Sequence, residues 1–482
     1  MTSLRLLRLT FLFPLCALLV TAAAAAAPRG ITGVVTSGPD FIRPSDTPPG
    51  KAWVYQLAFP FQVSATRAAV FCDIREGLAK GGGLEAGVDA ILFDSLERPI
   101  AYEAVPITRN HLEPNPRSQP AGQLALMMKG PMRGGFVPYG AKRADGSPHP
   151  HAGTGFSVNQ AIGLRTDRPA GSLAAFAGNE AYEYLEVHQL AYDDQKLAVT
   201  STAHLAEGEF LEGWRIVDGG LTNAIADGDD LLVGMTGAKV GESVLGAGVM
   251  RWRREDGRWR PVDFVSVTGP GGEGQSTEPS LVRDIDGSLL FCARGGRNEP
   301  EIQNDIRIWR SADAGRTWRK IIHARGAIST APVTLNQAAD GTPYVTANLY
   351  EVLMDAPDRK STTDSPVYSI RPDAQGRSRL GGWLRNKVYL WPLNAQRDTL
   401  EAPLLVRDSM AEFGRPPGDT SWRVDHPSAM TVRLADGRWH NILGMRVLEL
   451  GEGSMGLPPT PFTGCYLEEV ISSGEAIPLW HF

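Results

Sequence analysis

The sequence predicts an all-β protein with the architecture of a β-propeller. Glycine and proline supply 53 and 35 of the 482 residues, roughly one residue in five, and this content disfavours long helices. Four segments in the second half of the chain repeat one pattern, in which two short apolar stretches flank an Asp-Gly pair. Other apolar stretches of strand length precede these repeats, and none of them indicates an independent helical domain.

The Asp-Gly pairs mark the expected hairpin turns. A tight β-hairpin needs residues with positive φ, so Asp-Gly between two apolar stretches is the strongest short-range signal for one. The pairs are Asp227-Gly228, Asp286-Gly287, Asp340-Gly341 and Asp436-Gly437. The repeats cover 220–444 and start 58, 53 and 95 residues apart, the last gap being lengthened by a polar stretch over 355–379. A spacing of about 50–60 residues is typical of four-stranded propeller blades and allows six to eight of them. A β-sandwich also contains such hairpins, but the near-equal units and the X-Pro pair that opens several of them favour the propeller.

The chain before residue 220 is expected to continue the propeller. Its predicted strands are 53–63, 68–74, 90–94, 100–105 and 122–128. The predicted propeller therefore covers the mature chain, 28–482, with its clearest repeats in 220–444.

The first 27 residues predict a secretory signal peptide. Arg5 and Arg8 form a short basic region, an apolar run follows over 9–20, and small residues lead to Pro28. The apolar run is too short for a stable membrane span. We therefore expect a secreted or periplasmic protein with no membrane contact after cleavage, and a retained N-terminal anchor is the alternative.

Composition excludes several classes of partner. A formal net charge of -6 with 21% charged residues gives no polybasic footprint, so no nucleic-acid partner is expected. Three cysteines follow the leader, which allow at most one disulfide. They do not cluster with histidine, and His149-Pro-His151 is expected to be an exposed loop. No metal and no cofactor are predicted.

One octapeptide connects this pattern to a known family. Residues 311–318 read Ser-Ala-Asp-Ala-Gly-Arg-Thr-Trp and match Ser-x-Asp-x-Gly-x-Thr-Trp at every fixed position. This motif resembles the Asp-box, or BNR repeat, of the sialidase superfamily, and a degenerate copy lies at 255–259. The resemblance implies a propeller of six blades, with seven as the alternative. It also implies that the serine and aspartate close a turn between outer strands while the tryptophan packs between layers.

The resemblance extends to two charged residues. Sialidases carry a catalytic glutamate where a strand begins and a carboxylate-binding arginine where the returning strand ends, and Glu278 and Arg294 stand at those places. A hairpin brings its two ends to the same face, so both side chains are predicted to point into one central depression. The alternatives are a solvated charge for Glu278 and a structural partner for Arg294.

A histidine stands where the family's nucleophilic tyrosine would be. The chain reads Asp425-His426-Pro427-Ser428 there, and the family's N-terminal Arg-Ile-Pro motif is absent. His426 occupies the repeat position of Glu278, and a neutral imidazole can accept and return a proton near pH 7. Asp425 would point away from His426 on a regular strand and is expected to orient a loop.

Further residues are predicted to bind substrate at the same face. Arg297, Arg423 and Arg446 are expected to join Arg294 there, because several guanidinium groups suit a substrate carboxylate. Trp422 is the candidate for stacking on a sugar ring. The alternative for each arginine is a surface charge.

The leading functional prediction is a secreted, sialidase-like glycoside hydrolase acting on acidic glycans. In this prediction Glu278 and His426 transfer protons. One alternative is a polysaccharide lyase or glycosidase that acts on uronates with His426 as base, and another is a non-catalytic propeller that binds glycans. The expected partner is an acidic glycan, and no oligomeric state is predicted.

Overall fold

The protein is almost entirely β-structure in the computed structural model. In the part of the chain that the structure describes, helical structure is confined to one α-helical turn, α1 (Ser409–Glu412). No helix among the described residues is long and apolar enough to cross a membrane. The structure describes residues 29–76, 84–110, 112–114, 123–165, 182–206, 209–269, 274–296, 302–329, 331–349, 385, 387–412, 422–449 and 463–477.

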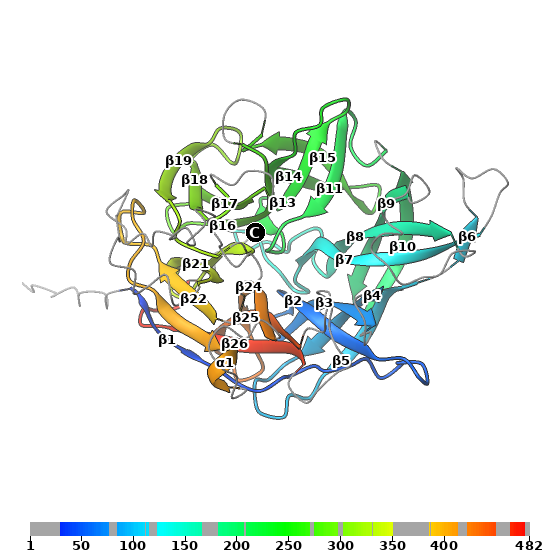
Figure 1. Cartoon of the computed structure of the whole chain (residues 1–482), viewed down its shortest axis with the longest axis horizontal. Helices are drawn as coiled ribbons and strands as arrows, with labels where there is room; N and C mark the ends of the chain where they lie inside the picture. The colour runs from blue at the N-terminus through cyan, green and yellow to red at the C-terminus, as the bar shows by residue number, and fades with distance from the viewer. Residues whose placement is uncertain are drawn as a thin grey trace, which may run out of the picture.

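Six antiparallel sheets surround a common axis as the blades of a propeller (Figure 1). Blade 1 contains β2 (Trp53–Ser64), β3 (Arg67–Glu76), β4 (Leu84–Phe93) and β5 (Glu103–Arg109). Blade 2 contains β6 (Leu112–Pro114), β7 (Gln123–Val137), β8 (Thr154–Arg165), β9 (Tyr182–Tyr192) and β10 (Leu197–Ala206). Blade 3 contains β11 (Trp214–Gly219), β12 (Ile225–Asp227), β13 (Asp230–Lys239), β14 (Gly246–Glu255) and β15 (Arg258–Ser266).

The last blade takes one strand from the other end of the chain. Blade 4 contains β16 (Ser276–Arg283), β17 (Leu289–Gly295), β18 (Ile306–Ser311) and β19 (Arg319–Ala324). Blade 5 contains β20 (Val333–Gln337), β21 (Pro343–Asn348), β22 (Lys387–Pro392) and β23 (Leu404–Asp408). Blade 6 contains β24 (Trp422–Arg433), β25 (Trp439–Glu449), β26 (Gly464–Ser472) and β1 (Ile31–Val35), which pairs with β26. The predicted propeller is confirmed, and it has six blades.

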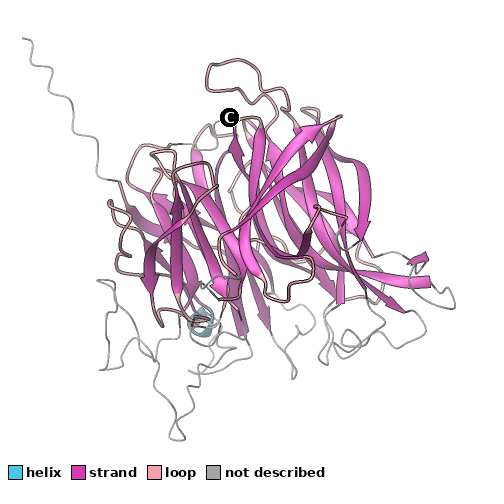
Figure 2. Ribbon diagram, turned by 90° about the horizontal axis from the view of Figure 1, so that it is seen from above, coloured by secondary structure: helices cyan, strands magenta, loops and turns pink. Residues whose placement is uncertain are grey.

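The inner strands form a closed ring. β2, β7, β11, β16, β20 and β24 each contact the next, and β24 contacts β2. Figure 2 shows the blades turned by 90°, with their strands running between two faces of the molecule. We call the face at which β16 and β24 begin the front face, and the face that carries their Asp-Gly turns the turn face.

Apolar side chains hold neighbouring blades together. Each of six buried clusters is shared by two adjacent blades, so the core lies between blades. Trp252, Trp259 and Trp309 are buried in these clusters, and Trp318, the tryptophan of the octapeptide, packs partly buried against one of them.

The predicted turns have the expected backbone conformation. The glycines of the four Asp-Gly pairs have φ between 62° and 84°, the left-handed region that favours glycine. The octapeptide forms the turn between β18 and β19, where Ser311 Oγ accepts a hydrogen bond from the Gly315 N–H at 2.9 Å. Asp313 accepts another from the Thr317 N–H at 2.9 Å, and the Trp318 ring N–H donates to the Gly315 carbonyl at 2.9 Å. These bonds close the turn between the two outer strands of blade 4.

Candidate functional site

A β-bulge places Glu278 at the front face of blade 4. The register between β16 and β17 pairs Thr277 with Arg294 and Pro279 with Ala293, which leaves Glu278 without an opposite residue. Glu278 has φ of 49°. A non-glycine residue in this region costs on the order of 1–3 kcal/mol, and such strain concentrates at functional sites.

Blade 6 carries the same bulge. The register between β24 and β25 pairs Asp425 with Arg446 and then shifts before Ser428. His426 lies within this shift and has φ of 53°. The prediction that His426 and Glu278 occupy the same repeat position is therefore confirmed, and Arg446 is the register equivalent of Arg294.

Glu278 forms an ion pair across its own hairpin. Its Oε2 atom lies 2.7 Å from Nη1 of Arg294, and its backbone N–H donates to Thr236 Oγ1 at 3.2 Å. Burial alone would raise the pKa of Glu278, but the charges of Arg294 and His426 and the hydrogen bond from Arg294 lower it to about 2. Glu278 is therefore a carboxylate at neutral pH. Its side chain is 18% exposed, so a ligand at the front face can reach it.

Asp425 binds one histidine and two arginines. Its Oδ1 atom accepts from His426 Nδ1 at 2.8 Å and also from Arg446 Nε. Its Oδ2 atom accepts from Arg385 Nη1 at 2.6 Å and from Arg446 Nη2 at 3.3 Å. Burial would raise the pKa of Asp425, but Arg446, His426 and Arg385 hold it well below the usual value.

The expectation that Asp425 points away from His426 is wrong. Consecutive side chains alternate only on a regular strand. The positive φ of His426 breaks this alternation, so both side chains face the same cluster and contact each other.

His426 is a neutral base held in one tautomer. Burial lowers its pKa to about 4 even though Asp425 acts in the opposite direction. Because the Asp425 carboxylate can only accept a hydrogen bond, the Nδ1 atom of His426 carries the proton. Nε2 is then the basic nitrogen. The side chain is 15% exposed.

Positive charge exceeds negative charge at this site. The guanidinium groups of Arg294, Arg385, Arg423 and Arg446 lie near the two carboxylates of Glu278 and Asp425, and all four arginines are buried. Burial lowers the pKa of Arg423 to about 10, and the neighbouring charges of Arg385 and Arg446 act in the same direction. The Nε atom of Arg385 is buried without a hydrogen-bond partner among the described residues. The site is therefore suited to an anion.

Two other blades contribute to the wall of the site. Gln56 of β2 accepts a hydrogen bond from Arg446 Nη1 at 2.8 Å. Arg133 of β7 is buried, and its guanidinium carbon lies 3.4 Å from the ring centroid of Phe59. Burial lowers the pKa of Arg133 to about 9, while Asp218 and Glu278 are among the acids that oppose this shift.

The structure thus brings most of the predicted site residues together. Glu278, Arg294, Arg423, His426 and Arg446 lie at the front face around the axis. Arg297 and the side chain of Trp422 lie outside the described residues, so their roles stay predictions.

Sequence reasoning missed Arg385, Arg133 and Gln56. Gln56 and Arg133 precede the repeats, Arg385 lies in the long gap between the last two repeats, and none of the three is next to a recognised motif. The sequence did contain a signal for Asp425. It is followed by His-Pro-Ser, and the equivalent position in blade 4, Thr277, is followed by Glu-Pro-Ser.

The expected exposure is wrong for His149, although its neighbours Pro148 and Pro150 are exposed. His149 is 3% exposed. Its Nε2 atom lies 3.5 Å from the Gly228 carbonyl oxygen, and its ring packs edge-on against His151. In the described part of the chain, no group of three or more histidine, cysteine or acidic residues could hold a metal ion.

No family model matches the sequence, and a search of curated proteins finds no significant match. The solved structures similar to this chain include the K499G mutant of NanB sialidase from Streptococcus pneumoniae, with 10% identity, a TM-score of 0.49, and coverage of 90% of this chain and 70% of that chain. The α-L-arabinanase of Penicillium chrysogenum complexed with arabinobiose has 9% identity and a TM-score of 0.45, covering 91% of this chain and 98% of that chain. A protein of unknown function from Dyadobacter fermentans has 12% identity and a TM-score of 0.47, covering 92% of this chain and 100% of that chain.

Proposed function

We propose that this protein is an exported, sialidase-like glycoside hydrolase that cleaves acidic glycans at its front face. The observation that carries the proposal is the excess of buried guanidinium groups around the Asp425–His426 pair. Burying like charges together is costly, so the arrangement favours a ligand that supplies the missing negative charge.

The substrate carboxylate would bind among the arginines. A guanidinium group can offer two parallel N–H donors to a carboxylate, and such charged hydrogen bonds are stronger than neutral ones. Arg294 and Arg385 each have one nitrogen engaged with a protein carboxylate. Arg423 lies beside them, and Arg297 and Trp422 are predicted to complete the sugar-binding surface.

His426 and Glu278 would handle the protons. Nε2 of His426 takes a proton from the attacking water, while Asp425 holds the ring and stabilises the imidazolium that forms. Glu278 is ionised in the free protein because Arg294 lies against it. When a substrate carboxylate offsets the charge of Arg294, burial dominates and raises the pKa of Glu278. Glu278 can then take up a proton and donate it to the departing glycosidic oxygen.

A second candidate function is elimination from a uronate-containing polymer. Arginines that neutralise a uronate carboxylate acidify the neighbouring C–H bond, and Nε2 of His426 would remove that proton. The electron pair then forms the new double bond as the bond to the glycosidic oxygen breaks, and this oxygen takes up the proton from the His426 imidazolium. The specific observation in its favour is a neutral imidazole beside arginines, where a sialidase would have tyrosine.

One screen separates these functions. The purified protein is incubated with sialylated glycans and with uronate-containing polymers, while new reducing ends and ultraviolet absorbance are both followed. Reducing ends without absorbance identify a hydrolase, and reducing ends with absorbance identify a lyase that forms an unsaturated uronate. If neither signal appears but an acidic glycan binds, the protein is a binding propeller. If no acidic glycan binds, the proposal is wrong.

A further inference from the structure

Two cysteines meet at the junction where the propeller closes. Cys72 lies in β3 of blade 1, and Cys465 lies in β26 of blade 6. Their Sγ atoms are 3.8 Å apart, and both residues are fully buried. Both are free thiols in the structure.

We propose that Cys72 and Cys465 form a disulfide that links the first blade to the last. The two sulfur atoms are already in van der Waals contact, so reaching the S–S bond length of about 2.05 Å requires a shift of less than 2 Å between them. Cys292 is the internal contrast, because it is buried in blade 4 within the apolar cluster shared with blade 5.

The bond would form by thiol–disulfide exchange with an oxidoreductase disulfide. The thiolate of one cysteine attacks the carrier disulfide, a mixed disulfide forms, and one carrier thiolate leaves. The thiolate of the second cysteine then attacks the sulfur of the first and releases the other carrier thiolate. In total the two protein thiols give up two protons and two electrons, and the carrier disulfide is reduced to two thiols.

The disulfide would form while the protein folds. Burial raises the pKa of both thiols in the folded protein, and only the thiolate attacks a disulfide. Exchange is therefore expected before blades 1 and 6 pack together, and the finished bond is protected from reductants.

The bond would stabilise the closure of the ring beside the candidate site. Blade 6 is also joined to the N-terminal part of the chain by the pairing of β1 with β26 and by an apolar cluster shared with blade 1. Cys465 lies opposite Arg446 in the register and contacts the backbone carbonyl of Gln56. The side chain of Gln56 accepts a hydrogen bond from Arg446, so the disulfide would hold together the two blades that form this wall.

Peptide mapping of the exported protein tests the proposal without any substitution. The protein is unfolded in the presence of an alkylating reagent without reductant and then digested. We expect one disulfide-linked peptide pair that contains Cys72 and Cys465, together with alkylated Cys292. Alkylated peptides for both Cys72 and Cys465 would overturn the proposal.

Unfolding with and without reductant gives a second test. We expect the oxidised protein to have a urea midpoint about 1 M above that of protein refolded in reductant, because the bond restricts the unfolded chain. Cys72→Ala should have the same midpoint in both conditions, and Cys292→Ala should retain the difference. A wild-type midpoint that does not depend on refolding in reductant would contradict a bond between these residues.

Discussion

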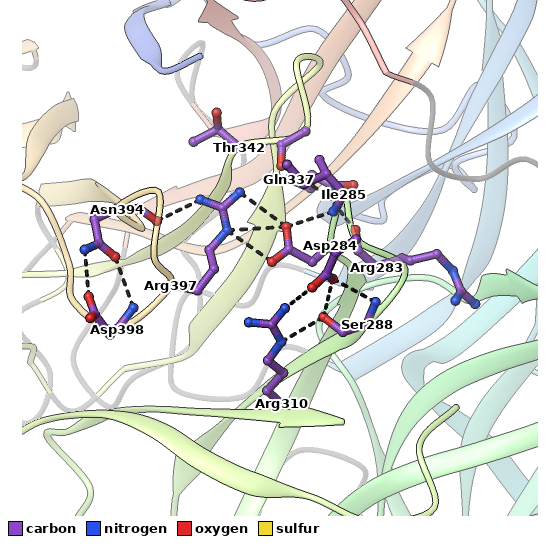
Figure 3. A network of polar contacts seen from close by, with 12 residues as sticks. Arg283, Asp284, Ile285, Ser288, Arg310, Gln337, Thr342, Asn394, Arg397 and Asp398 are labelled. Carbon is purple, nitrogen blue, oxygen red and sulfur yellow. Dashed lines mark hydrogen bonds and ion pairs between the residues drawn. The ribbon is translucent and has the colours of Figure 1, made fainter. Parts of the chain in front are cut away.

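The two ends of β16 hold buried charges in opposite ways. At the turn face, Asp284 is paired with one arginine, Arg397, whose Nε and Nη2 atoms lie 3.1 and 3.2 Å from its carboxylate oxygens (Figure 3). Arg397 also donates to the Asn394 carbonyl at 2.7 Å, and Asp284 accepts from the Ile285 N–H at 2.8 Å. At the front face, Glu278 and Asp425 are outnumbered by the arginines around them.

The difference separates a structural ion pair from the cluster to which the proposed function assigns ligand binding. A buried pair with matched charge and complete hydrogen bonds stabilises the fold only modestly, but breaking it leaves an isolated buried charge. A surplus of buried positive charge lowers the stability of the free protein, and binding of an anion removes this cost. Substitutions at the turn face should therefore affect stability, and substitutions at the front face should affect binding and catalysis.

The largest expected effect on activity comes from His426→Ala. Loss of a general base lowers the rate by roughly 10²–10⁴-fold, so kcat/KM on the acidic glycan found in the screen should fall within that range. The matched control is His440→Ala. His440 lies in the same hairpin at the turn face, where it is paired with Glu469 and Asp436. This control should lower the melting temperature and leave kcat/KM unchanged. Equal losses of kcat/KM in the two variants would contradict the distinction between the front face and the turn face.

Arg397→Met should have the largest effect on stability. It leaves the Asp284 carboxylate buried without its cation, so the free energy of unfolding should fall by about 3–5 kcal/mol. The measurement is urea unfolding followed by intrinsic fluorescence. Combining Arg397→Met with Asp284→Asn should restore part of the loss, and an additive further loss would argue against the pair.

Arg385→Met should weaken substrate binding with little effect on stability. A charged hydrogen bond contributes about 1.5–3 kcal/mol, so the dissociation constant for the acidic glycan should rise roughly 10- to 100-fold. Asp425 keeps Arg446 and His426 as partners in this variant. A fall in stability as large as that of Arg397→Met would show that Arg385 is a structural residue instead.

The smallest effect concerns the acid limb of the pH profile. His426 must be deprotonated to act as a base, and its pKa is lowered to about 4, below the ordinary value of about 6.5. Activity should therefore persist as the pH falls from 7 and should be lost as His426 takes up a proton near pH 4. The logarithm of kcat/KM measured against pH tests this prediction, and a midpoint near 6.5 would contradict the burial of the base.

Local sequence patterns predicted the repeated parts of the molecule well. The four Asp-Gly turns and the matching positions of Glu278 and His426 each depend on a few neighbouring residues, and the structure contains them. The strand that completes blade 6 could not be predicted in this way, because β1 comes from the opposite end of the chain.

The wall of the site depends on the closed ring. Arg133 and Gln56 reach it only because blades 1 and 2 lie beside blades 6 and 3. Arg385 adjoins Asp425 through a contact between blades 5 and 6. Asp425 faces His426 because of one positive φ angle, which alternation along a strand does not predict.

Calorimetric titration with an acidic saccharide and its carboxyl-reduced, neutral counterpart tests the surplus of positive charge most directly. We predict that the wild-type protein binds the acidic form at least about 10-fold more tightly, since each guanidinium–carboxylate hydrogen bond contributes over 1 kcal/mol, and that Arg385→Met narrows this difference. Equal affinity of the wild-type protein for the two saccharides would contradict the account.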